Sequence, residues 1–250
     1  MKHPIVHVEN FHLTISDKRI VEDLSFDVAP GEVFAFLGSN GSGKTSTIRS
    51  LLGIYQATGG TLHIDGKPLT PENAAIVGYL PEERGLYTRS KVLDTMIYFG
   101  ELKGMSREAA KAFSLAFLER VELADKATVK LKKLSGGQQQ KIQLGVAIMG
   151  NPKLLILDEP TKGLDPVNRK LLLDIVDELQ AKGVAVIYIT HLMEEVERLA
   201  DRLLILKDGV ARAYGSVAAV KKEFSSSSIE DIFVKIYNEK SSEHKGVAHV

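Results

Sequence analysis

The sequence predicts an α/β fold in which a mostly parallel central sheet carries an antiparallel β flank and an inserted helical subdomain. Short apolar runs rich in Val, Ile and Leu alternate with helical patterns along much of the chain, as in parallel sheets covered by helices. A glycine-rich turn joins one of these runs to a helix. A long stretch of helical period then lies between two groups of strands, which indicates an insertion.

Composition and charge argue against several classes of protein: disulfide-bonded, membrane-spanning and strongly nucleic-acid-binding ones. The chain has 250 residues, 44% of them hydrophobic, which is enough for a sizeable core. Its 32 basic and 32 acidic side chains cancel, so no overall field attracts nucleic acid or anionic lipid. The absence of cysteine excludes disulfides and thiolate metal sites. We find no signal peptide and no apolar run of roughly 18 residues, so we expect membrane contact only through a partner.

Short alternating runs predict the strands of the antiparallel flank. The first two are expected at Ile5–Glu9 and Leu24–Val28, with Phe11–Asp17 as the loop between them or its edge. Further short strands are expected at Thr61–Ile64, before a tight Asp65-Gly66 turn, and at Val77–Leu80.

The helical stretch runs from Val92 to Ala124, and a further helix is expected at Gly136–Met149. Two apolar faces are predicted within the stretch. The first consists of Leu93, Met96, Ile97, Phe99 and Gly100, and the second of Ala109, Ala112, Phe113, Ala116, Phe117 and Val121.

The rest of the chain returns to the α/β pattern. Buried strands are expected at Leu154–Leu157 and Val184–Ile189, on either side of the strand that carries the glycine-rich turn. The remaining predicted elements are helices at Val167–Ala181 and Glu194–Leu199, and a hairpin of Leu203–Leu206 with Val210–Tyr214. We therefore predict one domain over residues 1–224, with its core at 1–82 and 151–224 and a helical subdomain at 83–150. Residues 225–250 form an extension, with a short amphipathic helix and a disordered tail from Ser241.

The glycine-rich turn matches the phosphate-loop motif G-x-x-x-x-G-K-[ST]. It follows the apolar run Val33–Leu37 and precedes the helical segment Ser46–Leu52, which is the setting that this motif requires. Glycines let successive N–H groups point at one anion, and the helix adds about half a positive charge. Lys44 is placed to reach the β- and γ-phosphates and Thr45 to ligate Mg²⁺. The predicted nucleotide-binding residues are Gly38, Ser39, Asn40, Gly41, Ser42, Gly43, Lys44, Thr45 and Ser46.

Polar residues end the two buried strands that we expect beside this loop. Asp158 closes the run Leu154–Leu157 and is placed to hold Mg²⁺ directly or through water. Glu159 comes next and is placed to act as general base toward a water in line with the γ-phosphate. His191 follows the second strand, where its imidazole could bind the γ-phosphate or orient that water. Alternatively, His191 only starts a helix that Thr190 caps.

A second anion site is predicted where Leu134-Ser135-Gly136-Gly137-Gln138 begins a helix. Ser135 can cap that helix locally, and glycine N–H groups beside a hydroxyl at a helix start also bind anions. Two such helix starts, far apart in sequence, for one triphosphate suggest two chains that face each other.

Together these motifs resemble those of ABC-type ATPase subunits. The glycine-rich loop, LSGGQ, LLILDEP, GLD and a strand-end histidine occur in that family's order and spacing over about residues 1–220. The resemblance implies a P-loop NTPase core and a head-to-tail dimer that holds two Mg²⁺–ATP between the loop of one subunit and the signature helix of the other. It implies catalytic roles for Lys44, Glu159 and His191, and a D-loop at Asp165. The residues implied to contact the partner's γ-phosphate are Ser135, Gly136, Gly137 and Gln138.

Two positions depart from the family's pattern. Ile15 stands where an aromatic residue usually stacks on adenine, so stacking is either weak or supplied by Phe11. Glu82 stands at the position of the Q-loop glutamine. A carboxylate there can still ligate Mg²⁺, but it adds negative charge and cannot donate a hydrogen bond.

Two shorter strings resemble the ABC-2-type exporter ATPases, including sodium- and drug-efflux members. They are Leu80–Tyr87 and Glu230–Phe233. In the family, the region of Gly85–Tyr87 and Tyr98–Phe99 receives a short helix from the membrane subunit. Alternatively, these side chains pack within the helical subdomain, which the sequence favours more for Phe99 than for Leu86 or Tyr87. The resemblance thus implies a transmembrane permease as partner, a second ATPase subunit that is identical or closely related, and a location at the cytoplasmic face of the cell membrane.

Two other functions compete with transport. A soluble ABC ATPase that acts on nucleic acid or the ribosome usually has two cassettes or a long coiled-coil insertion, and this chain has one cassette and a net charge of zero. A non-hydrolysing regulatory dimer conflicts with the complete set of Lys44, Asp158, Glu159 and His191. The sequence does not name the cargo.

Overall fold

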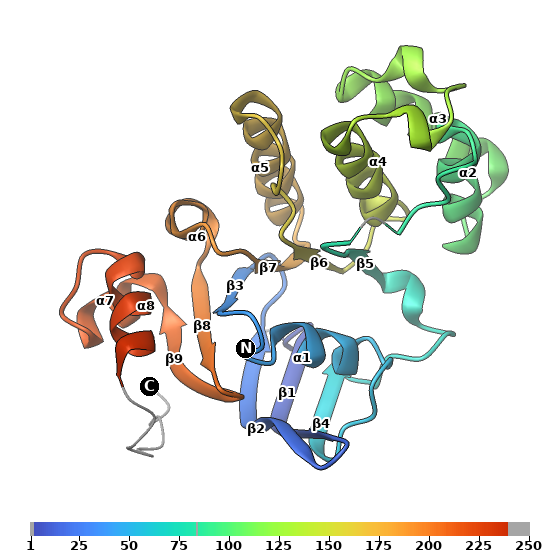
Figure 1. The fold of residues 1–250 in the computed structure, drawn as a ribbon. Coiled ribbons are helices and arrows are strands. Elements are labelled where there is room, and N and C mark those ends of the chain that lie inside the picture. The colour runs from blue at the N-terminus through green and yellow to red at the C-terminus, as the bar shows by residue number, and fades with distance from the viewer. Residues whose placement is uncertain (1–2, 84, 240–250) are drawn as a thin grey trace. The chain divides into compact units, whose positions relative to one another are not determined.

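The computed structural model describes residues 3–83 and 85–239 (Figure 1). It divides into two compact units, the first formed by Met1–Thr70 with Ala185–Val250 and the second by Pro71–Val184. The predicted boundaries of core, helical subdomain and extension stay predictions, and the predicted tail from Ser241 lies outside the described residues.

A small antiparallel sheet in the first unit confirms the predicted β flank. Its strands are β1 (Val6–Ile15), β2 (Lys18–Val28) and β4 (Gly59–Ile64), in the order β2-β1-β4. The predicted loop over Phe11–Asp17 is wrong, because β1 continues to Ile15 and only Ser16 and Asp17 form the turn. Shifts of register on either side of Phe11 break the alternation of β1, so its second half does not read as a strand.

The strand that leads into the phosphate loop lies in a second sheet of the first unit. Four of its strands follow in the order β7 (Ala185–Ile189), β3 (Val33–Gly38), β8 (Arg202–Lys207) and β9 (Val210–Ser216). β3 pairs in parallel with both β7 and β8, and β9 closes the predicted hairpin with β8. The prediction that Leu154–Leu157 lies beside β3 is therefore wrong, since β8 takes that place.

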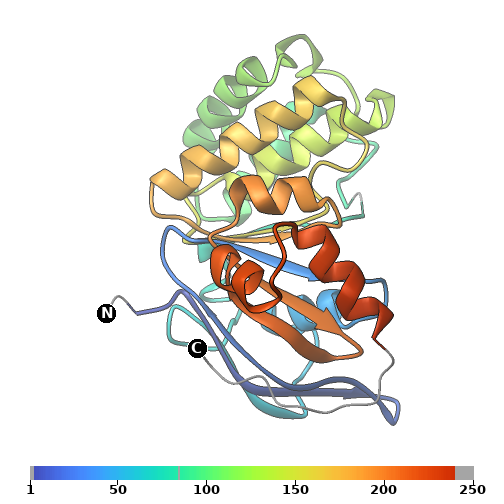
Figure 2. The same cartoon turned by 90° about the vertical axis from the view of Figure 1, so that its left-hand side faces the viewer.

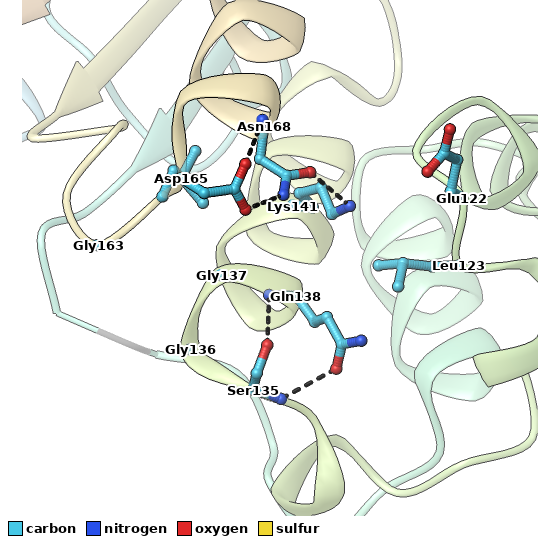
Figure 3. A pocket seen from close by; sticks show the side chains of 11 residues that line it. Glu122, Leu123, Ser135, Gly136, Gly137, Gln138, Lys141, Gly163, Asp165 and Asn168 are labelled. Carbon is cyan, nitrogen blue, oxygen red and sulfur yellow. Dashed lines mark hydrogen bonds between the residues drawn. The ribbon is translucent and has the colours of Figure 1, made fainter.

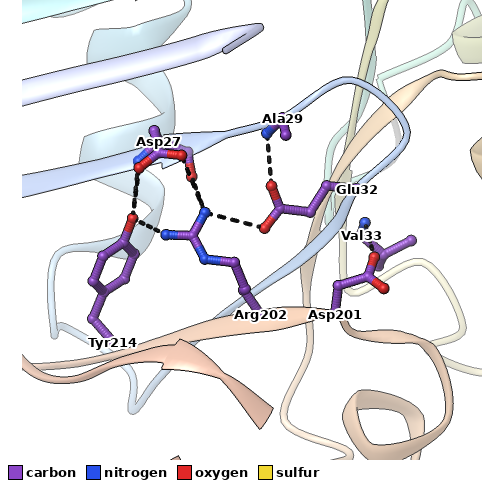
Figure 4. A network of polar contacts seen from close by, with 7 residues as sticks. All are labelled: Asp27, Ala29, Glu32, Val33, Asp201, Arg202 and Tyr214. Atoms are coloured by element: carbon purple, nitrogen blue, oxygen red, sulfur yellow. Dashed lines mark hydrogen bonds and ion pairs between the residues drawn. The ribbon is translucent and has the colours of Figure 1, made fainter. Parts of the chain in front are cut away.

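Arg202 ties four segments of the first unit together (Figure 4). Its guanidinium donates to Asp27 Oδ2 at 3.1 Å and Glu32 Oε1 at 3.4 Å, and it also donates to the hydroxyl of Tyr214. Burial alone raises the pKa of Asp27, but hydrogen bonds from Arg202 and Tyr214 hold that pKa below its ordinary value. Burial raises the pKa of Glu32, whose carboxylate also accepts from the Ala29 N–H at 2.6 Å. This cluster joins β2 and the start of β3 to the β8–β9 hairpin.

Helices cover the sheet of the first unit. They are α1 (Lys44–Leu51), α6 (Met193–Leu199), α7 (Val217–Glu223) and α8 (Ile229–Asn238). The predicted C-terminal helix is present as α8, and α7 was not predicted. Figure 2 shows α8, in red, lying along β8 and β9. Its buried Ile229, Ile232 and Ile236 pack in one cluster with Leu37 of β3 and Ile205 of β8, so α8 belongs to the core of this unit.

The second unit pairs β5 (Val77–Leu80) in parallel with β6 (Leu154–Asp158). Its helices are α2 (Val92–Leu102), α3 (Arg107–Arg120), α4 (Gly136–Ile148) and α5 (Pro166–Ala181), with 3₁₀ turns at Ala74–Ile76, Ala124–Lys126 and Leu131–Lys133. The predicted second apolar face is partly wrong, because Ala109, Ala112 and Ala116 of α3 are exposed. Its buried residues are Ala110, Ser114, Phe117 and Leu118, a stripe rotated by about one position.

A lysine at the end of α2 bonds the C-terminus of α4, the helix that carries the signature residues. Lys103 Nζ donates to the carbonyls of Val146, Ala147 and Met149 at 2.7–3.2 Å. Burial lowers the pKa of Lys103 to about 8. A cation at a helix C-terminus satisfies carbonyls that lack intrahelical partners, so Lys103 fixes this end of α4. No helix within residues 3–83 and 85–239 has the length and apolar character that a bilayer crossing requires.

We predict that Arg202→Ala lowers the free energy of unfolding by about 2–4 kcal/mol, because it leaves the buried Glu32 and the partly exposed Asp27 without their cation. Urea denaturation followed by circular dichroism measures this. Arg19→Ala is the control: it removes an ion pair with Glu22 in which both side chains are exposed, and it should cost much less than Arg202→Ala. Equal losses in the two variants would contradict the prediction.

Candidate functional site

The phosphate loop leaves β3 through a position that admits only glycine. A Cβ on Gly38 would lie 2.4 Å from Ser42 Oγ and 2.6 Å from the carbonyl oxygen of Leu206. Further along the loop, Gly41 and Gly43 have φ angles of 81° and 110°, in the left-handed region that side chains disfavour. The backbone can therefore fold back on itself and turn its N–H groups inward.

Lys44 begins α1 and bends back over the loop. Its Nζ donates to the carbonyls of Gly38 at 2.6 Å and Ser39 at 3.0 Å. The first turn of any helix has N–H groups without intrahelical acceptors, and α1 begins at Lys44, where the loop ends. Ser42 Oγ is buried and has no hydrogen-bond partner in the described part of the chain. These features fit a polyphosphate, as the sequence predicts.

The carboxylates predicted for metal binding and catalysis lie in the second unit. Asp158 is the last residue of β6 and is buried, and Glu159 follows it with a φ of 49°. A left-handed backbone at a residue other than glycine is uncommon and clusters at functional sites. Among the described residues, no group of three or more His, Cys, Asp or Glu could hold a metal ion by itself.

Glu82, at the departure from the Q-loop pattern, is held by a lysine. Lys162 Nζ lies 2.7 Å from Glu82 Oε1, and the hydrogen bond and charge of Glu82 raise the pKa of Lys162. Glu159 and Asp158 act on Lys162 in the same direction. The lysine thus offsets negative charge that the glutamate adds, and sequence reasoning did not identify it. Its sole signal was its place between the DEP and GLD motifs.

The signature residues line a pocket of about 450 Å³ within the second unit (Figure 3). Ser135 caps α4, and its Oγ accepts from the Gln138 N–H at 3.3 Å while Gln138 Oε1 accepts from the Ser135 N–H at 3.0 Å. This reciprocal pair is a capping box. It confirms the predicted cap and places the glycine N–H groups of the first turn at the pocket wall.

The D-loop residue forms the opposite side of the same pocket. Asp165 caps α5 by accepting from the N–H groups of Val167 and Asn168, both at 3.0 Å. Hydrogen bonds from Asn168 lower the pKa of Asp165. Lys141 Nζ donates to Asn168 Oδ1 at 2.9 Å and to the Val121 carbonyl at 2.8 Å. Sequence reasoning missed Lys141 and Asn168 because their contact joins two helices.

His191 is exposed on the turn after β7. The alternative that Thr190 caps the next helix is wrong, since α6 starts at Met193 after Leu192. Thr190 Oγ1 instead accepts from the Leu192 N–H at 3.0 Å and bonds to Glu195 Oε2 at 3.1 Å. These contacts fix the turn that carries His191.

The structure decides between the two possibilities for adenine stacking. Phe11 is fully buried in the core of the first unit, whereas Ile15 is 39% exposed. Phe11 therefore has no open face on which a base could stack.

Comparison with known proteins places this geometry in a family. A family profile described as ABC transporter matches residues 21–162. The chain is 42% identical over 222 residues to an uncharacterized ABC transporter ATP-binding protein, MJ1023, of Methanocaldococcus jannaschii, over 89% of this chain and 81% of the relative. The chain belongs to the ABC transporter family. It is an ATP-binding subunit of that family, with an ATP-hydrolysing domain.

Two further comparisons agree with this assignment. The Nod factor export ATP-binding protein I of Paraburkholderia xenovorans is 37% identical over 224 residues, which are 88% of this chain and 73% of the relative. A solved structure described as the ATP binding subunit of an ABC transporter superposes with a TM-score of 0.89 at 26% identity, over 94% of this chain and 100% of the other. The predicted α/β P-loop NTPase fold is thereby confirmed.

We predict that Gly38→Ala raises the Kd for a fluorescent ATP analogue at least about tenfold, because overpacking strain of about 1–3 kcal/mol falls on the loop. A fluorescence titration measures the Kd. Gly85→Ala is the matched control, since a Cβ there meets nothing within 4 Å, and it should leave the Kd unchanged. Wild-type affinity in Gly38→Ala would show that the loop does not need this close approach.

Proposed function

We propose that the chain is the motor subunit of an ABC exporter. Two copies, or one copy and a close relative, bind head to tail and hold Mg²⁺–ATP between the phosphate loop of one and the signature helix of the other. Binding closes the dimer, hydrolysis reopens it, and a separate transmembrane permease moves with this cycle. The subunit then lies at the cytoplasmic face of the membrane and contacts the bilayer only through the permease.

The start of α4 is the observation that carries the dimer. Its first turn lines a pocket, and the capping box holds that turn in place. A Cβ on Gly137 would lie 3.2 Å from Leu164. Glycine at this position therefore avoids crowding Leu164, which also lines the pocket. Glu122 and Asp165 add carboxylates to the lining, but Asp165 is already bonded to α5. A phosphate group of a nucleotide held by a second chain matches this polar, glycine-walled surface.

The residues of the phosphate loop and the two strand ends supply the chemistry. Thr45, Asp158 and Glu82 are the proposed protein ligands of Mg²⁺, which would shield the charge of the phosphates. Glu159 accepts a proton from the attacking water, and its constrained backbone fits a residue whose direction matters. Lys44 exchanges its bonds to the loop carbonyls for bonds to phosphate oxygens, and His191 orients the water or the γ-phosphate.

An exposed aromatic cluster supports a protein partner. The rings of Tyr87, Tyr98 and Phe99 lie 5.6–6.0 Å apart, centroid to centroid, and Tyr87 and Tyr98 are 56% and 44% exposed. Aromatic side chains clustered on a surface are typical of protein interfaces. We propose that the permease docks here. Export as the direction of transport rests on the relative named for Nod factor export.

The competing function on nucleic acid or the ribosome has no specific support. The net charge of zero supplies no general attraction to phosphate backbones. Copurification decides between the two: RNA retained with the purified chain would favour the competitor, and a membrane protein would favour transport.

We predict that Ser135→Asp lowers ATP turnover at least about a hundredfold, because a carboxylate about 4 Å from a γ-phosphate of the other chain repels it. Asp caps a helix as well as Ser, so circular dichroism and nucleotide affinity of the phosphate loop should not change. Phosphate release and an equilibrium titration measure the two effects separately.

The control for this experiment is Ser106→Asp, the same change at another helix cap of the second unit. Ser106 Oγ accepts from the Ala109 N–H at 3.1 Å, and we expect wild-type turnover. Turnover that is unchanged in Ser135→Asp would refute the composite site while leaving the phosphate loop intact.

We predict that Glu159→Gln lowers turnover by about 10²–10⁴, as loss of a general base does, while the Kd for ATP stays within about twofold. The unhydrolysed nucleotide should trap a dimer that size-exclusion chromatography with light scattering detects. Glu223→Gln, at the end of α7, is the control. Turnover in Glu159→Gln close to that of the wild type would remove Glu159 from the role of base.

A further inference from the structure

The phosphate loop is bonded to a residue near the end of the described chain. The Tyr237 hydroxyl of α8 accepts from the Ser39 N–H at 2.7 Å and donates to the Leu206 carbonyl at 2.6 Å. Ser39 is the second residue of the loop, and Leu206 pairs with Gly38 at the end of β3. One hydroxyl thus bridges the first bend of the loop to the neighbouring strand.

The position of Tyr237 is fixed by several independent contacts. Its ring stacks on Phe233 at 4.4 Å between centroids, and the Lys207 ammonium lies 5.7 Å from the ring centre. The buried Lys207 also donates to the carbonyls of Ile236 at 2.9 Å and Glu239 at 2.6 Å. A cation that bonds the last carbonyls of a helix stabilises its C-terminus, so α8 ends firmly beside the loop.

The other end of α8 is anchored as well. Ser228 caps the helix, and the Ile229 N–H donates to Glu197 Oε1 at 3.0 Å. Ile229, Ile232 and Ile236 pack into the apolar cluster that includes Ala35 and Leu37 of β3. The helix and the strand that carries the loop therefore share one core, and α8 has little freedom to move relative to the loop.

We propose that Tyr237 is a positioning residue for nucleotide binding, through which α8 holds the phosphate loop in its binding conformation. The Ser39 N–H, bonded to Tyr237, fixes the direction of the first bend. The N–H groups that follow then converge on the phosphates before the nucleotide arrives. A loop that is ordered beforehand binds more tightly, because less conformational entropy is lost on binding.

This role differs from that of a catalytic residue. Tyr237 touches the loop and not the reacting atoms, so its loss should weaken binding of substrate and transition state alike. Such uniform weakening raises KM and leaves kcat unchanged. It also applies to ADP, which shares the α- and β-phosphates that the loop binds.

The test is Tyr237→Phe in the full chain, which removes one oxygen and keeps the ring and the three isoleucine anchors. Loss of a hydrogen bond of ordinary strength should raise the Kd for both Mg²⁺–ATP and Mg²⁺–ADP by about threefold to tenfold, with kcat within about twofold of the wild type. Hydrogen exchange resolved to single amides should show faster exchange at Ser39, with the amides of β3 unchanged.

Tyr214→Phe is the matched control, because it removes a hydroxyl from the same unit that bonds Asp27 and Arg202 at a distance from the loop. It should lower the thermal midpoint at least as much as Tyr237→Phe and leave both Kd values unchanged. Wild-type nucleotide affinity in Tyr237→Phe would overturn the proposal, whatever the exchange rate at Ser39. An equal loss of affinity in Tyr214→Phe would also overturn it, since the effect would then reflect general destabilisation.

Discussion

The close approach of Gly38 to β8 is the constraint on which the rest of this structure depends. Where β3 ends, the Leu206 carbonyl and the Ser42 hydroxyl occupy the space that a side chain would need. The strand itself is buried along nearly its whole length, so its end cannot shift to relieve a clash. The loop therefore starts from a fixed point and in a fixed direction. Because that starting point is rigid, the N–H groups of the loop and the Lys44 side chain keep a fixed direction toward a bound phosphate.

Electrostatics explains why this rigidity matters for affinity. Lys44 bonds to loop carbonyls, so a phosphate must compete with these hydrogen bonds and the net gain per bond is small. Affinity then depends on how little the loop must rearrange. The same reasoning applies to Glu82, because its pairing with Lys162 lowers the repulsion that an extra carboxylate would exert on phosphate. The departure from the Q-loop pattern is thus accompanied by a local compensation.

Local chemistry could be predicted from the sequence, and long-range pairing could not. The phosphate loop, the cap formed by Ser135 and the strand ending at Asp158 depend on residues that are adjacent in the chain, and their patterns were interpreted correctly. The neighbours of β3 were not predicted correctly. The sequence shows that β8 pairs with β9 in a hairpin, but nothing in the residues of β8 specifies that its other edge pairs with β3. The second half of β1 was missed because register shifts hide its period. Tyr237 gave no signal, since its role exists only through contact with Ser39.

The start of α1 and the start of α4, which we propose to bind a phosphate of the second chain, are held in place by different means. The start of α1 is fixed by glycines packed against a strand and by the contact of Ser39 with α8. The start of α4 is fixed by the capping box of Ser135 with Gln138, and Lys103 holds the opposite end of that helix. Neither has to fold around its ligand, so little of the interaction energy with ATP is lost in ordering the sites. Under the proposed function, that energy remains available to hold two chains together, as a dimer that closes on ATP requires.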